Sequence, residues 1–361
     1  MKNSFGNAIN ISLFGESHGA GVGVLIDGIA PGIKVDEDFI AQQLTLRRPK
    51  EKISTARREP DEYIIQSGVF NGYTTGAPLC IFIPNTDTRS RDYTPDLPRP
   101  SHADFTAHEK YHGFEDYRGG GHFSGRLTAA IVAAGAIVIP ALREMGIYIG
   151  TCINQIARIG ISDIPTDKDT LLAISESDYG LIDDYAIAMM KDTVEIAAKD
   201  GDSIGGILET AIIGLPTGLG EPWFDGVESQ IARAVFGVPA VKEISFGAKD
   251  IAIMNGSSAN DQFIINNGKI TTATNNSGGI QGGITNGMPV IFRTTIKPTP
   301  SISQTQMTVN MSTGEEVDLN IKGRHDPCIV PRARIVIDSI AALVVADMLT
   351  VRYGSDALTQ K

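Results

Sequence analysis

Two long, almost uniformly apolar stretches, residues 124–145 and 334–352, limit the folds open to this chain. Helices that are apolar on every face lie between other layers of a protein. The most apolar run, residues 127–142, is shorter than a membrane span and rich in alanine, so it fits a buried helix better than a transmembrane one. We therefore expect two central buried helices.

Shorter segments with strand or helix patterns surround these two helices. Apolar patterns predict strands at 22–29, 63–70, 78–84 and 205–214, and helices at 36–48, 183–199 and 227–236. The strands come in pairs, with few strand–helix–strand units. This order predicts an α+β fold in which antiparallel sheets flank the long helices, rather than a doubly wound parallel sheet. Residues 85–123 and 255–287 are rich in turn-forming residues and are predicted to be loops.

Charge, length and cysteine content narrow the class of protein. A net charge of −11 argues against binding to nucleic acid or to an anionic membrane. Length alone allows about two domains, but no change in composition marks a boundary, so we expect a single domain over residues 1–361. The three cysteines are widely spaced and form no CxxC pair, and the first residues show no signal-peptide pattern. These features predict a cytoplasmic protein.

Four of the six histidines lie in short polar segments framed by glycine or proline, namely His18, His102, His122 and His325. Loops on a rigid scaffold are common places for binding and catalytic groups, and histidine moves protons near neutral pH. The other two histidines, His108 and His112, lack an HExxH context. We predict that they are surface residues and that the chain has no metal site.

Several segments could hold an anion. The arginines at 47–48, 57–58 and 99 could clamp carboxylates or phosphates, although for each one alone a solvated charge is the better explanation. The segment 119–126 places glycines and Ser124 just before the first long helix, which suits an oxygen-rich ligand or simply a capped turn. Residues 277–287 allow close approach of the backbone to a flat or phosphorylated ligand, or serve only tight turns. Residues 297–301 fit a phosphate cradle or a proline-rich strand end.

Two familiar site types are disfavoured. No GxGxxG occurs in a strand–turn–helix context, which argues against a Rossmann dinucleotide site. A nucleophilic triad of Ser17, His18 and Asp326 can be imagined, but no nucleophile-elbow sequence supports it.

Ten short motifs, taken in their order along the chain, resemble the chorismate synthase family. The similarity extends from residue 5 to about residue 349. The motifs are GESHG at 15–19, RRP at 47–49, SGVF at 67–70, TTGAP at 74–78, RPSHAD at 99–104, RGGG at 118–121, GVPAVKE at 237–243, SGGIQGGI at 277–284, KPTPSI at 297–302 and GRHDPC at 323–328.

The resemblance implies a fold, a reaction and a cofactor. The family fold is a β–α–β sandwich, and its members form homotetramers. The family converts 5-enolpyruvylshikimate 3-phosphate to chorismate and phosphate by a 1,4-anti elimination. It needs reduced FMN although there is no net redox change, and NADPH enters only as a source of reduction. Two alternatives stay open: an FMN-dependent oxidoreductase with net hydride transfer, and a non-catalytic flavin- or phosphate-binding protein.

The resemblance also implies roles for individual residues. His18, with Ser17 beside it, would protonate or stabilise the reduced flavin, His102 would neutralise the leaving phosphate, and Asp326 would assist proton removal. The substrate-binding residues would be Arg47, Arg99 and Arg126. The FMN-binding residues would be His122, Phe123, Ser124, Pro239, Ala240, Gly282, Lys297, Pro298, Thr299, Pro300, Ser301 and Arg324.

The chain departs from the family pattern at a few of these positions. Many members have Arg at the position of His122, Ser at Phe123 and Asn at Pro239, and Ile53 replaces a basic residue. The departures leave His18, His102 and Asp326 in place.

Overall fold

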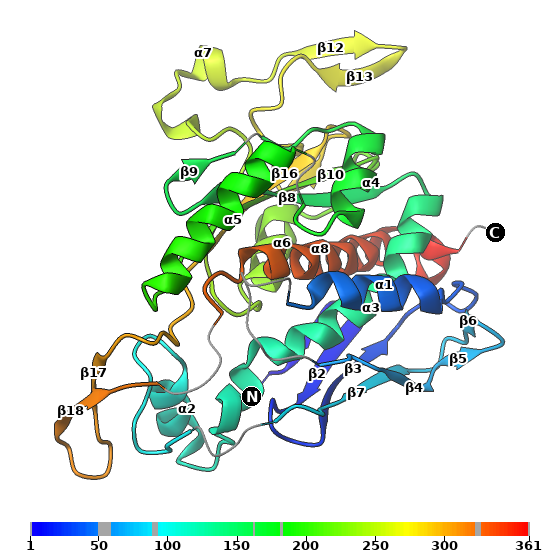
Figure 1. The fold of residues 1–361 in the computed structure, drawn as a ribbon. Coiled ribbons are helices and arrows are strands. Elements are labelled where there is room, and N and C mark those ends of the chain that lie inside the picture. The colour runs from blue at the N-terminus through cyan, green and yellow to red at the C-terminus, as the bar shows by residue number, and fades with distance from the viewer. Residues whose placement is uncertain are drawn as a thin grey trace.

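The two predicted apolar helices form the centre of the molecule. The computed structural model describes residues 2–49, 59–88, 93–161, 163–180, 183–321 and 326–359. Helices α3 (Thr128–Glu144) and α8 (Val330–Tyr353) pack against each other and are buried along most of their length (Figure 1). A Cβ on Gly135 of α3 would lie 2.4 Å from the Cβ of Ser339 on α8, so glycine is what lets the two helices approach this closely.

A five-stranded antiparallel sheet lies on each side of the helices. The first has the order β1-β2-β3-β7-β4, with bounds Ser4–Phe5, Asn10–Gly15, Gly21–Asp27, Leu79–Pro84 and Ile64–Ser67. The second has the order β11-β16-β10-β8-β9, with bounds Val241–Phe246, Val290–Ile296, Gly206–Ile213, Tyr148–Ile156 and Ile159–Gly160. The helices between them confirm the predicted α+β sandwich (Figure 1).

Two further helices complete the middle layer. Helix α1 (Glu37–Arg47) contacts both α3 and α8, and helix α6 (Val227–Val235) contacts α8. The Asp36 side chain caps α1 by accepting a hydrogen bond from the Phe39 N–H. Helices α4 (Lys168–Glu176) and α5 (Asp184–Lys199) belong to the half of the molecule that contains the second sheet (Figure 1).

The two predicted loop regions contain more regular structure than the sequence suggested. Residues 85–123 include helix α2 (Asp104–Tyr111) and the 3₁₀ helix η3 (Arg118–Phe123). The other region includes α7 (Gly256–Ala259) and two hairpins, formed by β12 (Phe263–Asn266) with β13 (Lys269–Thr272) and by β14 (Ile280–Gln281) with β15 (Ile284–Thr285). The predicted strand at 63–70 is divided into β4 and β5 (Val69–Phe70) at Gly68, which has a φ of +86°.

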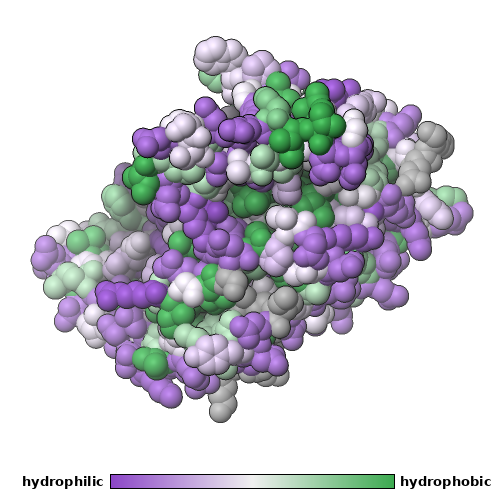
Figure 2. Space-filling view, turned by 90° about the horizontal axis from the view of Figure 1, so that it is seen from above, coloured by the Kyte–Doolittle hydropathy of each residue, from purple (hydrophilic) through white to green (hydrophobic). Residues whose placement is uncertain are grey.

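The remaining small elements are two short strand pairs and several short 3₁₀ helices. Strand β5 pairs with β6 (Tyr73–Thr74), and β17 (Gln306–Val309) pairs with β18 (Glu316–Leu319). Short 3₁₀ helices occur at Gly125–Leu127, Trp223–Asp225, Ile251–Ile253 and Ser355–Leu358. The β12–β13 hairpin projects at the top of Figure 1, and the view from above shows mostly hydrophilic residues with separate hydrophobic patches (Figure 2).

Within the described part of the chain, one stretch is apolar and long enough to cross a membrane on composition alone. It is the continuous helical segment Gly125–Glu144, which includes α3, and 89% of its most apolar window is buried inside the protein. Burial between the two sheets accounts for its apolar composition.

Candidate active site

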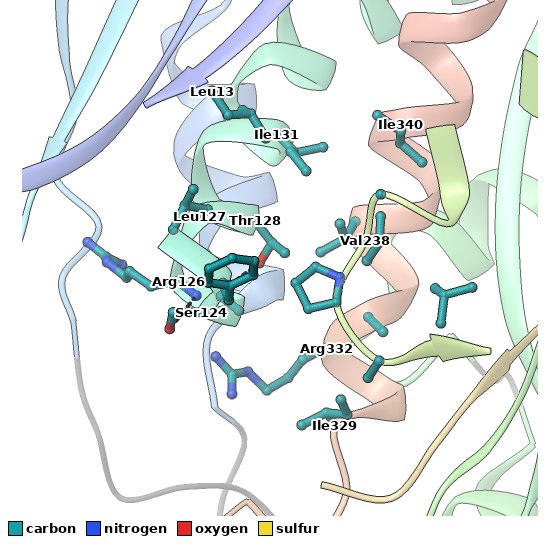
Figure 3. A pocket seen from close by; sticks show the side chains of 18 of the residues that line it. Leu13, Ser124, Arg126, Leu127, Thr128, Ile131, Val238, Ile329, Arg332 and Ile340 are labelled. Carbon is teal, nitrogen blue, oxygen red and sulfur yellow. Dashed lines mark hydrogen bonds between the residues drawn. The ribbon is translucent and has the colours of Figure 1, made fainter. Parts of the chain in front are cut away.

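A cavity of about 960 Å³ opens beside the central helices. The end of α1, the segment before α3, the connection from α6 to β11 and the start of α8 form its walls (Figure 3). Its inner wall is apolar and includes Ile131, Val238 and Ile340. A volume of this size accommodates a flat aromatic group together with a small molecule.

The rest of the cavity lining is strongly cationic. Among the residues that the structure describes, eight lysines and arginines line it against three acidic residues, in a chain whose net charge is −11. The basic residues are Lys2, Arg47, Arg48, Arg126, Arg233, Lys242, Lys297 and Arg332, and the acidic ones are Glu59, Asp61 and Asp326. Such a local excess of positive charge attracts polyanionic ligands.

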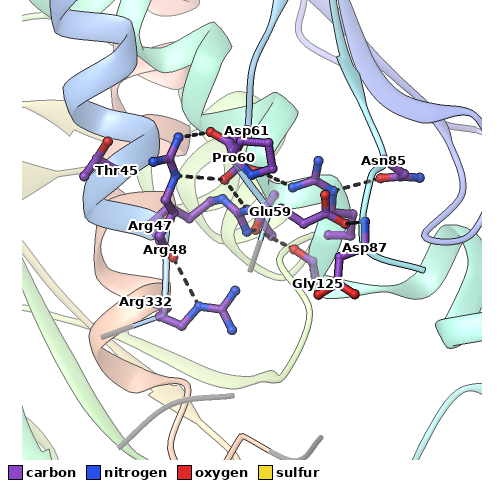
Figure 4. A network of polar contacts seen from close by, with 12 residues as sticks. Thr45, Arg47, Arg48, Glu59, Pro60, Asp61, Asn85, Asp87, Gly125 and Arg332 are labelled. Atoms are coloured by element: carbon purple, nitrogen blue, oxygen red, sulfur yellow. Dashed lines mark hydrogen bonds and ion pairs between the residues drawn. The ribbon is translucent and has the colours of Figure 1, made fainter. Parts of the chain in front are cut away.

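A buried carboxylate connects two of these arginines. Arg47 Nη2 donates to Asp61 Oδ2 at 2.8 Å, and Arg126 Nη1 donates to Asp61 Oδ1 (Figure 4). The Asp61 side chain is wholly buried, and those of Arg47 and Arg126 are 4% and 3% exposed. Burial raises the pKa of Asp61, but the guanidinium groups of Arg47 and Arg126 outweigh it and hold the pKa below its ordinary value. Asp61 is therefore ionised at neutral pH.

Asp326 belongs to the same polar network. Arg332 Nη1 donates to Asp326 Oδ2 at 2.5 Å, and Arg332 Nε donates to the carbonyl of Arg47 at 3.1 Å. Burial lowers the pKa of Arg47 to about 10, with Asp61 opposing the shift and Arg332 and Arg126 adding to it. Arg47 thus stays charged at neutral pH although it lies close to two other arginines inside the protein.

The glycine-rich segment 119–121 docks against the GESHG loop. All three glycines have positive φ, between 51° and 80°, a backbone conformation that other residues adopt at a cost. The Ser17 N–H donates to the Gly121 carbonyl at 3.0 Å, and the His122 Nδ1–H donates to the Gly15 carbonyl at 2.8 Å. These bonds bring His18 and His122 to one end of the site.

His18 and His102 are both held by aromatic or charged neighbours. The His18 ring meets Tyr93 edge to face, with centroids 5.4 Å apart. His102 Nδ1 lies 2.6 Å from Asp104 Oδ1, so the carboxylate accepts its proton and leaves Nε2 as the ring nitrogen available to a ligand. Burial raises the pKa of Asp104, but hydrogen bonds from Arg99 and His102 hold it well below its usual range.

Arg99 connects this end of the site to the segment 297–301. Its guanidinium donates twice to Asp104, at 2.8 Å each, and once to Ser301 Oγ at 3.4 Å. It also lines a second cavity of about 430 Å³, which shares Ala103 and Phe123 with the first. The two cavities are therefore neighbouring parts of one region.

The segment 297–301 presents polar groups to the first cavity. Lys297 Nζ donates to the carbonyl and hydroxyl oxygens of Ser101, at 2.6 and 2.8 Å. Burial and the nearby charge of Lys242 lower the pKa of Lys297. The buried hydroxyl oxygen of Thr299 has no hydrogen-bond partner among the described residues. Such an orphaned group fits a site that is completed by a ligand.

Comparisons with known proteins agree with this geometry. The chain matches the chorismate synthase family over residues 9–350. It is 45% identical over 350 residues to the chorismate synthase of Pyrococcus abyssi, covering 96% of this chain and 97% of that one. The chorismate synthase of Dehalococcoides mccartyi, strain BAV1, is 46% identical over 360 residues and 98% of each chain.

The chain belongs to the chorismate synthase family. A solved structure described as "Crystal Structure of Chorismate Synthase" has a TM-score of 0.76 and 28% identity, and the match covers 97% of this chain and 94% of that one. The fold expected from the family motifs is thereby confirmed. The similarity runs through both sheets and the central helices, which position the site.

The structure brings most of the residues predicted from the family motifs to one place. The following of them line the first cavity: Arg47, His102, His122, Phe123, Ser124, Arg126, Pro239, Ala240, Lys297, Thr299, Pro300, Ser301 and Asp326. Pro239 and Ala240 adjoin the segment 297–301, because the Ala240 carbonyl accepts from the Lys297 N–H at 2.9 Å.

A few predicted residues lie elsewhere. Ser17 and His18 lie against the glycine-rich segment rather than in the first cavity's lining. Pro298 does not line either of the two cavities, and Gly282 lies in the β14–β15 turn, also outside their linings. Arg324, His325, Ile53 and the arginines at 57–58 lie outside the described residues. Within the described residues, no group of three or more His, Cys, Asp or Glu side chains could hold a metal ion.

Sequence reasoning missed several residues of the chorismate synthase site. Asp61, Asp104 and Arg332 each hold a predicted site residue in place, by the contacts given above. Asp104 has a local signal, since it follows His102 by two positions in RPSHAD. Asp61 and Arg332 lie 14 and 285 positions from their partner Arg47, so no local pattern reveals them.

Proposed function

We propose that this chain converts 5-enolpyruvylshikimate 3-phosphate to chorismate and phosphate by a 1,4-anti elimination. The observation that carries the proposal is the cationic cavity, which joins residues from five of the ten family motifs in one place. The substrate bears a phosphate and carboxylates, and the arginine-rich lining complements those charges.

We further propose reduced FMN as the cofactor. The apolar inner wall suits a flat ring, and Lys297 with the orphaned hydroxyl of Thr299 suits a phosphate or ribityl chain. When bound, the reduced flavin supplies electron density as the carbon–oxygen bond breaks and regains it afterwards, so there is no net redox change. The other FMN contacts are assigned to residues 122–124, 239–240, 298, 300, 301 and 324 and to Gly282.

The protein's own residues bind the substrate and move two protons. Arg47, Arg99 and Arg126 hold the anionic groups and orient the ring. Asp326 assists removal of the proton that leaves carbon, and His102 donates a proton from Nε2 to the departing phosphate. Asp104 keeps the His102 ring oriented throughout by its contact with Nδ1.

His18 is assigned the second proton-handling position, with Ser17 as its neighbour. Gly119 packs against the imidazole and Tyr93 meets its edge, and these two contacts orient the ring. A positioned imidazole there stabilises negative charge that develops nearby during the reaction.

Three remaining properties follow from the family assignment as proposals. The chain acts in the cytoplasm, forms a homotetramer, and depends on NADPH only where NADPH serves to reduce the flavin. None of them requires a nucleic acid or membrane partner.

The decisive experiment is an anaerobic assay with dithionite-reduced FMN and 5-enolpyruvylshikimate 3-phosphate. We expect chorismate and phosphate in equal amounts, with no stoichiometric flavin oxidation. Substrate-dependent flavin oxidation would favour the oxidoreductase alternative, and binding without turnover would favour a non-catalytic protein. His18→Ala should lower turnover by roughly 10²- to 10⁴-fold, as for loss of a general acid, while its circular dichroism stays that of the wild type.

A further inference from the structure

We propose that Asp61 is a positioning residue that fixes the guanidinium groups of Arg47 and Arg126 where they bind the anionic substrate. The inference rests on the proposed function, because it deepens the account of the same site. The Asp61 side chain is wholly buried at the cavity wall, where it pairs with both arginines. It acts through them and is not a catalytic residue.

Asp61 is the point where two separate elements meet. Arg47 ends helix α1, and Arg126 lies in the 3₁₀ turn that precedes α3. One carboxylate oxygen receives a hydrogen bond from each guanidinium. The carboxylate therefore sets the spacing between two cations that the chain contributes from positions 79 residues apart.

The two arginines depend on Asp61 to different degrees. Arg126 has further partners, since its Nε donates to Asn85 Oδ1 at 2.9 Å and its Nη2 donates to the Pro84 carbonyl at 3.1 Å. Arg47 has one other side-chain contact, a 3.5 Å hydrogen bond to Thr128 Oγ1, and its buried Nε has no partner among the described residues. Loss of Asp61 should therefore release Arg47 more than Arg126.

The positive charges around Asp61 are not fully balanced, which favours an anionic ligand. One carboxylate faces two guanidinium groups, so a positive charge is in excess at this end of the cavity. Arg48 lies near the same carboxylate, with Nε 4.0 Å from Asp61 Oδ2. A phosphate or carboxylate of the substrate would supply the missing negative charge.

The backbone at Asp61 supports a positioning role. Its φ is +51°, which is uncommon for a residue other than glycine. Arg48 donates to the carbonyl of the preceding Pro60. Such a conformation persists where surrounding contacts hold it, which is frequent at functional sites.

The test compares Michaelis constants for 5-enolpyruvylshikimate 3-phosphate in wild type, Asp61→Asn and Asp61→Glu. We expect KM to rise by roughly 10- to 100-fold in Asp61→Asn, as for a lost hydrogen bond between charged groups, with a smaller change in kcat. Asp61→Glu keeps the charge but displaces the carboxylate, and its KM should also rise. If Asp61→Asn does not fold, the KM of Asp61→Glu tests the proposal in its place.

A double substitution distinguishes an effect of Asp61 on KM that passes through Arg47 from a general effect on the protein. If Asp61 acts through Arg47, adding Asp61→Asn to Arg47→Ala should raise KM by less than about threefold, because coupled sites are not additive. Glu209→Gln is the matched control. It removes a buried carboxylate that pairs with Arg293 at 2.8 Å outside the lining of the cavity, so it should lower the melting temperature and leave KM unchanged.

The possible results are distinguishable. A wild-type protein that makes no chorismate would refute the proposed function itself. Two results with an active wild type would overturn only the role of Asp61. One is an unchanged KM in both Asp61 variants. The other is a double variant whose KM increase equals the product of the increases in the two single variants.

Discussion

At the scale of single residues, Gly119 determines where the His18 imidazole can lie. Its φ is +62°, and a Cβ built on it would lie 2.0 Å from both Cε1 and Nδ1 of His18. No real side chain tolerates such a contact, so the histidine position requires glycine here. Glycine at this position of the RGGG motif is therefore required both for its positive φ and for the space that the His18 ring occupies.

Gly119→Ala should therefore displace His18 without removing it. We expect kcat to fall at least tenfold, because small displacements of a positioned group carry large kinetic costs. The measurement is steady-state turnover with reduced FMN, combined with His18→Ala in a double variant. Since both changes disable the same imidazole, the double variant should be no slower than His18→Ala alone.

Gly72→Ala is the control for the backbone cost of the substitution. Gly72 has a φ of +78°, and a Cβ on it would meet nothing within 4 Å. It should show the backbone cost alone, a loss of stability of about 1 kcal/mol, with normal turnover. Equal turnover losses in the two variants would show that the effect of Gly119 is not local to His18.

At the scale of elements, the sequence predicted the long helices, which depend on composition. It missed short helices and hairpins, which depend on local turns. Helices α3 and α8 were predictable because continuous apolar sequence of that length has few alternatives. Helix α2 was missed because its eight residues bury only Ala107. The β12–β13 hairpin did have a signal, since Asn267-Gly268 joins two apolar runs and both residues have positive φ.

Helix α8 also carries a buried polar pair that its apolar sequence obscures. The Asp338 side chain accepts a hydrogen bond from Thr151 Oγ1 at 2.6 Å and lies 3.7 Å from Arg334 Nη1. Arg334 in turn donates to the carbonyls of Ile174 and Ser177. The contacts tie the central layer to the second sheet and to the end of α4.

Burial raises the pKa of Asp338 to about 6, although Arg334 and Thr151 oppose the shift. The folded state then binds a proton more tightly than the unfolded state, so this group's contribution to stability is lost as pH rises from about 4 to about 6. The unfolding free energy of the wild type relative to Asp338→Asn should fall by up to about 1.4 kcal/mol per pH unit in that range. Urea titrations at several pH values would measure it, and parallel profiles would contradict the prediction.

At the scale of the whole molecule, the sequence predicted which residues belong to the site but not how they are arranged in space. The family motifs named residues from 17 to 326, and the two sheets with their helix layer bring most of them around one cavity. Asp61 was not among them, because its partner Arg126 lies 65 positions away. Contacts of that kind depend on how α1 and α3 pack, which no local pattern specifies.

The cavity also differs in charge from the molecule that contains it. Its lining is cationic while the chain as a whole carries −11, so the field that attracts the substrate is local and sensitive to salt. We expect KM for 5-enolpyruvylshikimate 3-phosphate to rise several-fold between low and about 0.5 M salt, with little change in kcat, because screening weakens attraction more than it alters chemistry inside the site.

Lysine variants show whether the cavity is the source of this salt dependence. Lys242 is exposed and lines the cavity, so Lys242→Gln should raise KM at low salt and flatten its rise with salt. Lys199→Gln makes the same charge change at the end of α5, outside the lining, on a side chain that is 76% exposed. Because that lysine lies on the general surface, its variant should follow the wild type. Identical behaviour of the two variants would mean that the overall charge of the protein, rather than the arrangement of cations around the cavity, governs substrate capture.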